Sequence, residues 1–219
     1  FLVIDVAWMA ANMVKIEYGG WVPIAIAVAI FAMMSTWKRG RIMLNRILHS
    51  GALPLDLFLD DVIRRKPVRV PGTAVFMTSS PNGVPVVLLH HLKHNKVLHE
   101  EVILLTIQVK EIPAVLDGER MSVTKLPLGF WRVVAQYGFM EAPDAQRLLT
   151  AARAFGLRAQ RMETTYYLGR EQLLPIGSTK LATWRKKLYA FMARNSLSAT
   201  AFFGLPPNRV VELGAQLEI

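Results

Sequence analysis

Residues 21–37 read WVPIAIAVAIFAMMSTW and contain no charged side chain. With Gly19 and Gly20, the run approaches the roughly 20 residues, at about 1.5 Å rise each, that cross a hydrocarbon core about 30 Å thick. Trp21 and Trp37 stand at its two ends, where an indole ring can lie among lipid headgroups. The pattern predicts a membrane-spanning helix. The alternative, a buried helix of a soluble protein, seldom has such aromatic and basic flanks.

Basic residues follow this run immediately, beginning with Lys38, Arg39 and Arg41. Lys and Arg concentrate on the cytoplasmic side of membrane helices, so this end and the chain after it are predicted to be cytoplasmic. We expect a multi-pass protein of the cell (inner) membrane. The membrane-interface anchors would be Trp21, Trp37, Lys38, Arg39 and Arg41.

A second apolar stretch precedes the first. Residues 1–16, FLVIDVAWMAANMVKI, are typical of a span whose beginning is missing, and the short turn at 17–20 would make the two helices antiparallel. Since the chain starts at Phe1, inside an apolar run, we interpret it as a fragment. We expect an α-helical transmembrane hairpin at 1–38, formed by the last two transmembrane helices with the first one truncated.

Asp5 lies inside this first apolar run. An ionised carboxylate at membrane depth costs several kcal/mol unless it is paired, hydrated or protonated. Asp5 is therefore a candidate for ion or proton coupling. The alternative is that Asp5 lies near the cytoplasmic membrane face, where it is hydrated or caps a helix.

Residues 39–70 form a predicted linker. Apolar and basic positions alternate at helical spacing from 41 to 65, interrupted by Gly51 and Pro54. Such a pattern suits an amphipathic segment lying near anionic headgroups. An ordinary solvated connecting helix is equally compatible with it.

The rest of the chain, 71–219, alternates between strand and helix patterns. β-Branched and aromatic runs bounded by Gly, Pro, Asn and Ser indicate strands, and runs that start after Pro or Asp and end at Gly or Asn indicate helices. One pair of strands flanks a turn at 126–128. This mixture predicts a cytoplasmic α/β domain with a mixed sheet. The expected strands are 73–78, 101–109, 120–125, 129–137, 164–168 and 210–213, and the expected helices are 85–95, 144–155 and 181–195.

The sequence contains no motif typical of catalysis. The absence of cysteine excludes a Cys-ligated zinc site and a thiol nucleophile. His90 and His94 could share a helix face, as zinc ligands do, but Lys93 and Lys96 would repel a cation. The stretch 79–83 is most simply a turn and only weakly suggests a nucleotide-binding loop. We expect no enzyme, no cofactor and no metal site.

The formal net charge of +10 has two explanations, anionic lipid and nucleic acid. Beside a membrane span, lipid is the partner that the charge favours, and we expect no nucleic acid partner.

Several segments resemble the bacterial Kup-type potassium uptake permeases of the KUP/HAK/KT family. The similarity runs in order along essentially the whole chain, which makes it more specific than any single motif. The matching pieces are GGWVP at 19–23, STWKRGR at 35–41, RVPGTAVFMT at 69–78, HHLKHNKVLHE at 90–100, YGFMEAP at 137–143, TTYYLGRE at 164–171 and FFGLPPNRVVELGAQLEI at 202–219.

The resemblance implies the end of a LeuT-like permease, a secondary active transporter of twelve spans that imports potassium ions with protons. It implies as partners the potassium ion and the proton, membrane lipid and the remaining transmembrane helices of the parent permease. A homo-oligomer is left open. Asp5 corresponds by position to an acidic residue of the penultimate span, and the histidines fall in a family-like stretch, which favours a structural role. The alternative function is a membrane-tethered cytoplasmic regulatory module that binds a nucleotide or another anionic ligand.

Overall fold

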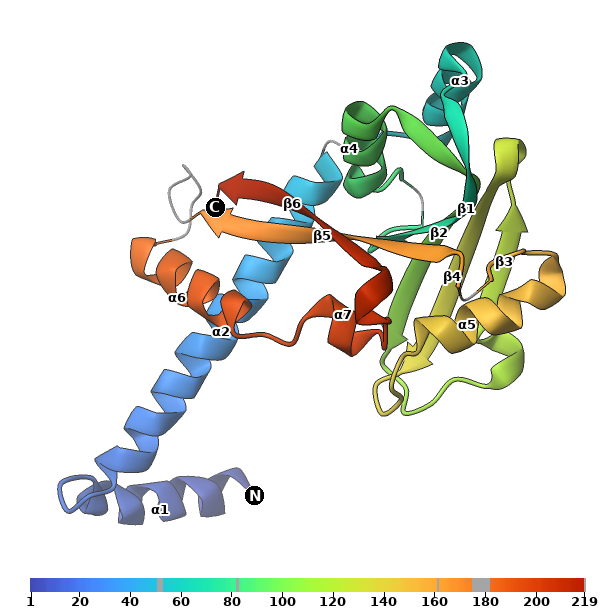
Figure 1. Ribbon diagram of the computed structural model, residues 1–219. Helices are drawn as coiled ribbons and strands as arrows, with labels where there is room; N and C mark the ends of the chain where they lie inside the picture. The colour runs from blue at the N-terminus through green and yellow to red at the C-terminus, as the bar shows by residue number, and fades with distance from the viewer. Residues whose placement is uncertain (51–52, 82, 161, 175–181, 219) are drawn as a thin grey trace. The chain divides into compact units, whose positions relative to one another are not determined.

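A computed structural model of the chain describes residues 1–50, 53–81, 83–160, 162–174 and 182–218. The chain divides into two compact units. The first unit contains Phe1–Arg46 and the segment that ends at Asn195, and the second contains Ile47–Leu174 and Ser196–Glu218. Figure 1 labels the helices and strands of both units.

The first unit begins with two helices joined by a tight turn. Helix α1 spans Leu2–Met13, continues as the 3₁₀ helix Val14–Ile16, and is followed by α2, Trp21–Ser50. The amide of Gly20 donates to the carbonyl of Lys15 at 2.9 Å and closes the turn. A Cβ on Gly20 would lie 2.8 Å from the same oxygen, so the turn requires glycine there. The predicted pair of consecutive helices is confirmed.

The third helix of this unit comes from far along the sequence. Helix α6 spans Thr183–Arg194, within the predicted range 181–195, of which residue 181 lies outside the described residues. The ring of Tyr189 on α6 packs on the ring of Trp37 on α2, with centroids 5.6 Å apart.

The second unit is built on one six-stranded sheet with the order β3-β4-β2-β1-β5-β6. All neighbouring strands are parallel except β3 and β4, which form the predicted antiparallel hairpin. The mixed sheet is therefore confirmed. The strands are β1 Val68–Thr78, β2 Val97–Lys110, β3 Met121–Lys125, β4 Phe130–Gly138, β5 Thr164–Leu174 and β6 Val210–Glu218.

Helices cover both faces of this sheet, because successive strand residues point to opposite faces. On β1, Phe76 packs in one core with α3 (Leu55–Arg65) and α4 (Val86–Asn95). Its neighbour Val75 packs in a second core with α5 (Ala145–Ala152). The domain is thus a three-layer α/β sandwich.

Several strands are longer than their sequence patterns indicated. β1 begins within the predicted linker, at Val68, and includes a bulge between Val70 and Thr73. β5 and β6 continue as a paired ladder well past the predicted ends at 168 and 213. In those stretches the ladder hydrogen bonds hold a sequence that has little of the apolar alternation on which strand prediction depends. The short helix α7, Ala199–Phe202, was not predicted.

Candidate functional site in the membrane segment and the domain pocket

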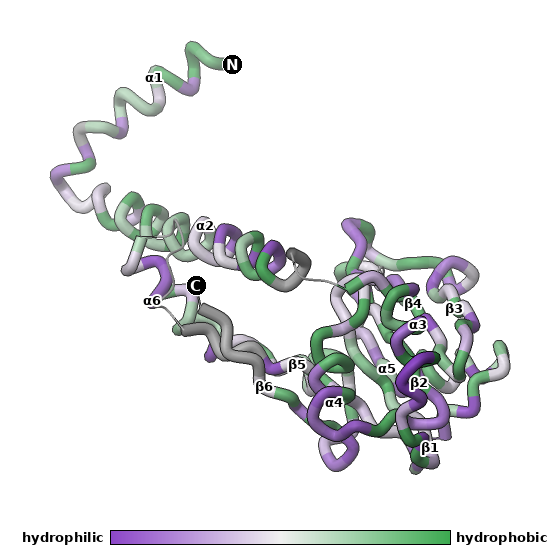
Figure 2. Tube along the Cα trace, turned by 90° about the horizontal axis from the view of Figure 1, so that it is seen from above, coloured by the Kyte–Doolittle hydropathy of each residue, from purple (hydrophilic) through white to green (hydrophobic). Residues whose placement is uncertain are grey.

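Helix α2 has the length and the surface of a transmembrane helix. Residues Trp21–Ile47 form the one helix, among those described, that is long and apolar enough to cross a membrane, and 6% of its most apolar window is buried. Apolar side chains project on several sides, including Val28, 62% exposed, and Phe31, 71% exposed. A helix that is apolar all round and uncovered by protein belongs in lipid. Figure 2 shows the change from hydrophobic to hydrophilic residues along α2.

The predicted interface anchors lie on this one helix. Trp21, at its first residue, is 58% exposed, whereas Trp37 is half-buried against α6. Lys38, Arg39 and Arg41 are all exposed. The helix continues past them without a break to Ser50, so the basic residues lie on the same rigid helix, directly after the apolar run.

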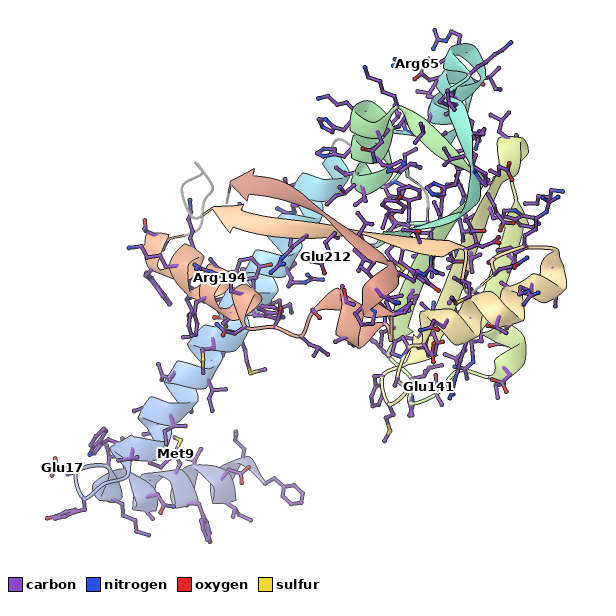
Figure 3. The ribbon with its side chains drawn as sticks, in the orientation of Figure 1. Met9, Glu17, Arg65, Glu141, Arg194 and Glu212 are labelled. Carbon is purple, nitrogen blue, oxygen red and sulfur yellow. The ribbon has the colours of Figure 1, made fainter. Side chains whose placement is uncertain are left out.

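Asp5 lies in the first turn of α1 and is exposed. Its backbone amide donates to the carbonyl of Phe1 at 3.0 Å, but among the described residues its carboxylate has no hydrogen bond or ion pair. The nearest charged residues along the chain, Lys15 and Glu17, lie at the other end of α1, where Figure 3 labels Glu17 at the turn. The structure brings none of the predicted anchors to Asp5.

The α/β domain contains a pocket of about 550 Å³ beside the bulge in β1 and near the amino ends of β4 and β5. Three of its glycines have positive φ angles, which leaves room where a side chain would intrude. The pocket carries three carboxylates and two cations. The lining residues are Gly72, Thr73, Glu100, Glu101, Lys125, Gly129, Trp131, Gly156, Arg158, Gln160 and Glu163.

Glu101 is the buried acid of this pocket, with 7% of its surface exposed. Its carboxylate accepts hydrogen bonds from the Thr73 hydroxyl at 2.9 Å and from the backbone amides of Arg158 at 3.0 Å and Ala159 at 2.9 Å. The carboxylate thereby ties β1, β2 and the segment before β5 together. A buried carboxylate whose oxygens already accept three hydrogen bonds has a structural role. The exposed Glu100 and Glu163 are more accessible to a ligand.

Four histidines lie on or next to α4: His94 is exposed, His90 and His99 are half-buried, and His91 is buried. His90 and His94 lie four residues apart on α4, with ring centroids 6.1 Å apart. His91 and His99 pack against Tyr167, and burial lowers the pKa of both imidazoles. No group of three metal-ligating side chains occurs among the residues that the structure describes.

Sequence reasoning missed two features of the site. Glu101 was predicted to begin a strand, and its spacing from other acids indicated no particular role, because its hydrogen-bond partners Arg158 and Ala159 are far away in sequence. Tyr189 was recognised only as part of an amphipathic helix. The spacing of Thr36, Gly40 and Leu44, all buried on one face of α2, was a local signal that another helix packs there.

The fold and the apolar helix α2 define the class of protein. It is an integral membrane protein in which a transmembrane helix is joined to a separate α/β domain. Residues 1–42 match the K⁺ potassium transporter integral membrane domain, and residues 71–219 match the K⁺ potassium transporter C-terminal domain. The chain belongs to this potassium transporter family.

Similar proteins agree with this assignment. A probable potassium transport system protein Kup of Anaeromyxobacter sp. (strain Fw109-5) is 56% identical over 224 residues, which cover 100% of the chain and 34% of that relative. The corresponding protein of Myxococcus xanthus is 52% identical, with coverages of 100% and 34%, and Kup 1 of Geobacter sulfurreducens is 47% identical, with coverages of 100% and 35%. The chain therefore spans about a third of the length of these relatives. No solved structure matches it. The resemblance to Kup-type permeases is confirmed.

Proposed function

We propose that this chain is the C-terminal part of a secondary active transporter that imports potassium ions together with protons. The observation that supports this most strongly is the apolar run of α2, which lies within residues 1–42, the segment that matches a potassium transporter integral membrane domain. Since the chain covers about a third of its relatives' length, we assign the main potassium path to parts of the permease beyond these residues. No enzymatic role is proposed for the α/β domain, which would assist folding, assembly or gating.

Asp5 is our candidate for ion or proton coupling within this chain. It is exposed on α1, and no described side chain neutralises its carboxylate. At membrane depth a carboxylate must bind a cation, bind a proton or remain hydrated. A potassium ion and a proton are the two cargoes proposed for this symporter, and a carboxylate can bind either of them. Asp5 is therefore the residue of this segment best suited to bind one in exchange for the other.

The proposed topology follows from the basic end of α2. We place the permease in the cell inner membrane as a multi-pass protein, with Lys38, Arg39, Arg41 and the α/β domain on the cytoplasmic side. Cysteine labelling tests this directly: these 219 residues contain no cysteine, and any cysteine elsewhere in the permease is first replaced by serine. A single cysteine introduced at Gly118 of the full-length permease should react with an impermeant maleimide only after the cells are opened. Reaction in intact cells would place the domain outside.

A regulatory module that binds an anionic ligand, including a nucleotide, is the second candidate function. The pocket beside Glu101 is the observation that favours some ligand, although its carboxylates outnumber its cations. It also lies near the amino ends of strands, whereas open α/β sheets usually bind ligands at the carboxyl ends. Calorimetry of the chain in detergent with candidate nucleotides tests the idea. Absence of both heat and thermal shift would count against it.

Growth tests the main proposal. The full-length permease should restore growth at limiting potassium to cells that lack their own uptake systems. An empty vector is the control, and equal expression is checked in the membrane fraction. Failure to restore growth by a correctly inserted permease would contradict potassium import. Self-association stays a prediction, which sedimentation of the detergent-solubilised permease measures.

A further inference from the structure

Helix α6 is attached to α2 at the level where the apolar run ends. Tyr189 of α6 is 1% exposed and packs on Trp37 with an interplanar angle of 58°. Gly40, one turn further along α2, is buried beneath the same ring, and a Cβ there would lie within 2.6 Å of the ring atom Cγ. Trp37 marks the headgroup level of the span. Contact with Trp37 therefore holds α6 at the headgroup level too.

Among the described residues, the side chains on the face of α6 opposite Tyr189 are exposed. Trp184 is 53% exposed and Phe191 is 63% exposed. Lys187 and Arg194 are also exposed and lie on the same side, because the four positions follow one another at intervals of three and four residues. Figure 3 labels Arg194 on this helix. The exposed stripe thus alternates an aromatic ring and a cation along its whole length.

The charge of α6 has one sign. The helix sequence TWRKKLYAFMAR contains four basic residues and no acidic residue. The guanidinium of Arg185 lies 5.1 Å from the ring of Trp184, which adds a second cation beside that ring. Aromatic rings beside cations suit a surface whose outer layer carries phosphate charge and whose inner layer is apolar. The anionic inner leaflet has this composition, and water alone gives Trp184 and Phe191 no apolar environment.

We propose that α6 is an interfacial helix that lies on the membrane surface in which α2 is inserted, with Trp184 and Phe191 in the headgroup layer and Lys187 and Arg194 on the phosphates of anionic lipids. Figure 1 shows α6 crossing α2, as a helix lying along the surface beside a span would. The α/β domain would then be held to the membrane twice, once through α2 and again through a helix that follows β5 in the sequence. This proposal does not depend on potassium import.

Depth measurement tests the proposal. Because the natural chain has no cysteine, a nitroxide label can be attached to one introduced cysteine at a time. The test variant is Phe191→Cys. Met34→Cys is the control for a site in the membrane, and Leu116→Cys is the control for a site in water. Leu116 is 74% exposed and precedes a short turn with two acidic residues. The chain is reconstituted in vesicles of phosphatidylcholine with phosphatidylglycerol. We expect the label at 191 to collide with oxygen, as at 34, and to be shielded from a water-soluble nickel chelate.

Two outcomes would overturn the proposal. Access of the nickel chelate to 191 equal to its access to 116 would place this face of α6 in water. Shielding from both reagents, in the vesicles or in the full-length permease, would show that protein covers α6. The lipid charge is tested separately with Lys187→Gln and Arg194→Gln combined. In this variant, phosphatidylglycerol should no longer increase the shielding at 191, and circular dichroism should show an unchanged fold because both altered side chains are exposed.

Discussion

Arg120 and Glu141 close the open end of the β3–β4 hairpin, where the Arg120 guanidinium donates to Glu141 Oε1 at 2.8 Å. Glu141 also accepts from the backbone amides of Gly138 at 2.7 Å and Val115 at 3.1 Å. The amide of Gly138, then Arg120, then the amide of Val115 lower the pKa of the Glu141 carboxyl from 4.5 to about 2. Figure 3 labels Glu141 at this position. One side chain thus joins the end of β4 to the loop before β3.

This lowered pKa predicts an acid-dependent loss of stability. A carboxyl whose pKa is lower in the folded state stabilises the fold above its unfolded pKa, and the stabilisation is lost as pH falls from about 4.5 towards about 2. Glu141→Gln should lower the urea midpoint of the detergent-solubilised chain at pH 7 and flatten its pH dependence in that window. Glu119→Gln, an exposed acid nearby, is the control. Parallel pH profiles for the natural chain and Glu141→Gln would refute this role.

Glu101→Ala should destabilise the α/β domain by about 3 kcal/mol, because two buried amides and the Thr73 hydroxyl would lose their acceptor. The neighbouring Glu100→Ala is the matched control, since Glu100 is exposed. Urea unfolding of the chain in detergent measures the free energy of unfolding of both variants. The dependence of that free energy on urea concentration should remain unchanged. A loss of equal size in the two variants would show that the hydrogen bonds of Glu101 are not the cause.

Gly40→Ala should separate α6 from α2, because the new methyl group would occupy the position of the Tyr189 ring. Hydrogen exchange of the α6 amides should become faster, while exchange in the sheet stays the same. Gly118→Ala is the control, since a Cβ there meets nothing within 4 Å. Unchanged protection of α6 in Gly40→Ala would mean that the contact with Tyr189 does not hold the helix.

Asp5→Asn in the full-length permease should depress potassium uptake about tenfold or more at limiting potassium. The variant would lose the negative charge proposed to bind the potassium ion or the proton. A polar interaction with a charged group is worth about 1.5–3 kcal/mol, and 1.4 kcal/mol corresponds to about a factor of ten. Rubidium uptake measures the effect, and the amount of permease in the membrane must stay the same. Asp5→Glu, which keeps the carboxylate, should retain more activity. Normal uptake by Asp5→Asn would remove this residue from the coupling mechanism.

The span could be predicted from residues 21–37 because transfer into lipid depends on the composition of one continuous stretch. The strand around Val75 and the β3–β4 hairpin were predicted for a similar reason, since alternation and turn residues are local signals. The ends of β5 and β6 could not be predicted, because pairing with a distant strand maintains them where the local pattern has ended. Domain boundaries at 38 and 70 stay predictions, although α2 continues unbroken across the first of them.

Hydropathy and charge along the chain were sufficient to establish a membrane helix, the basic residues at its end and an α/β domain after it. Only the folded structure revealed the order of the strands and the three hydrogen-bond donors around Glu101. The same holds for the packing of Tyr189 against Trp37 and Gly40. Local patterns report each residue's preference for water, lipid or an extended backbone. Contacts between residues far apart in sequence depend on complementary shapes that form only when the elements pack together.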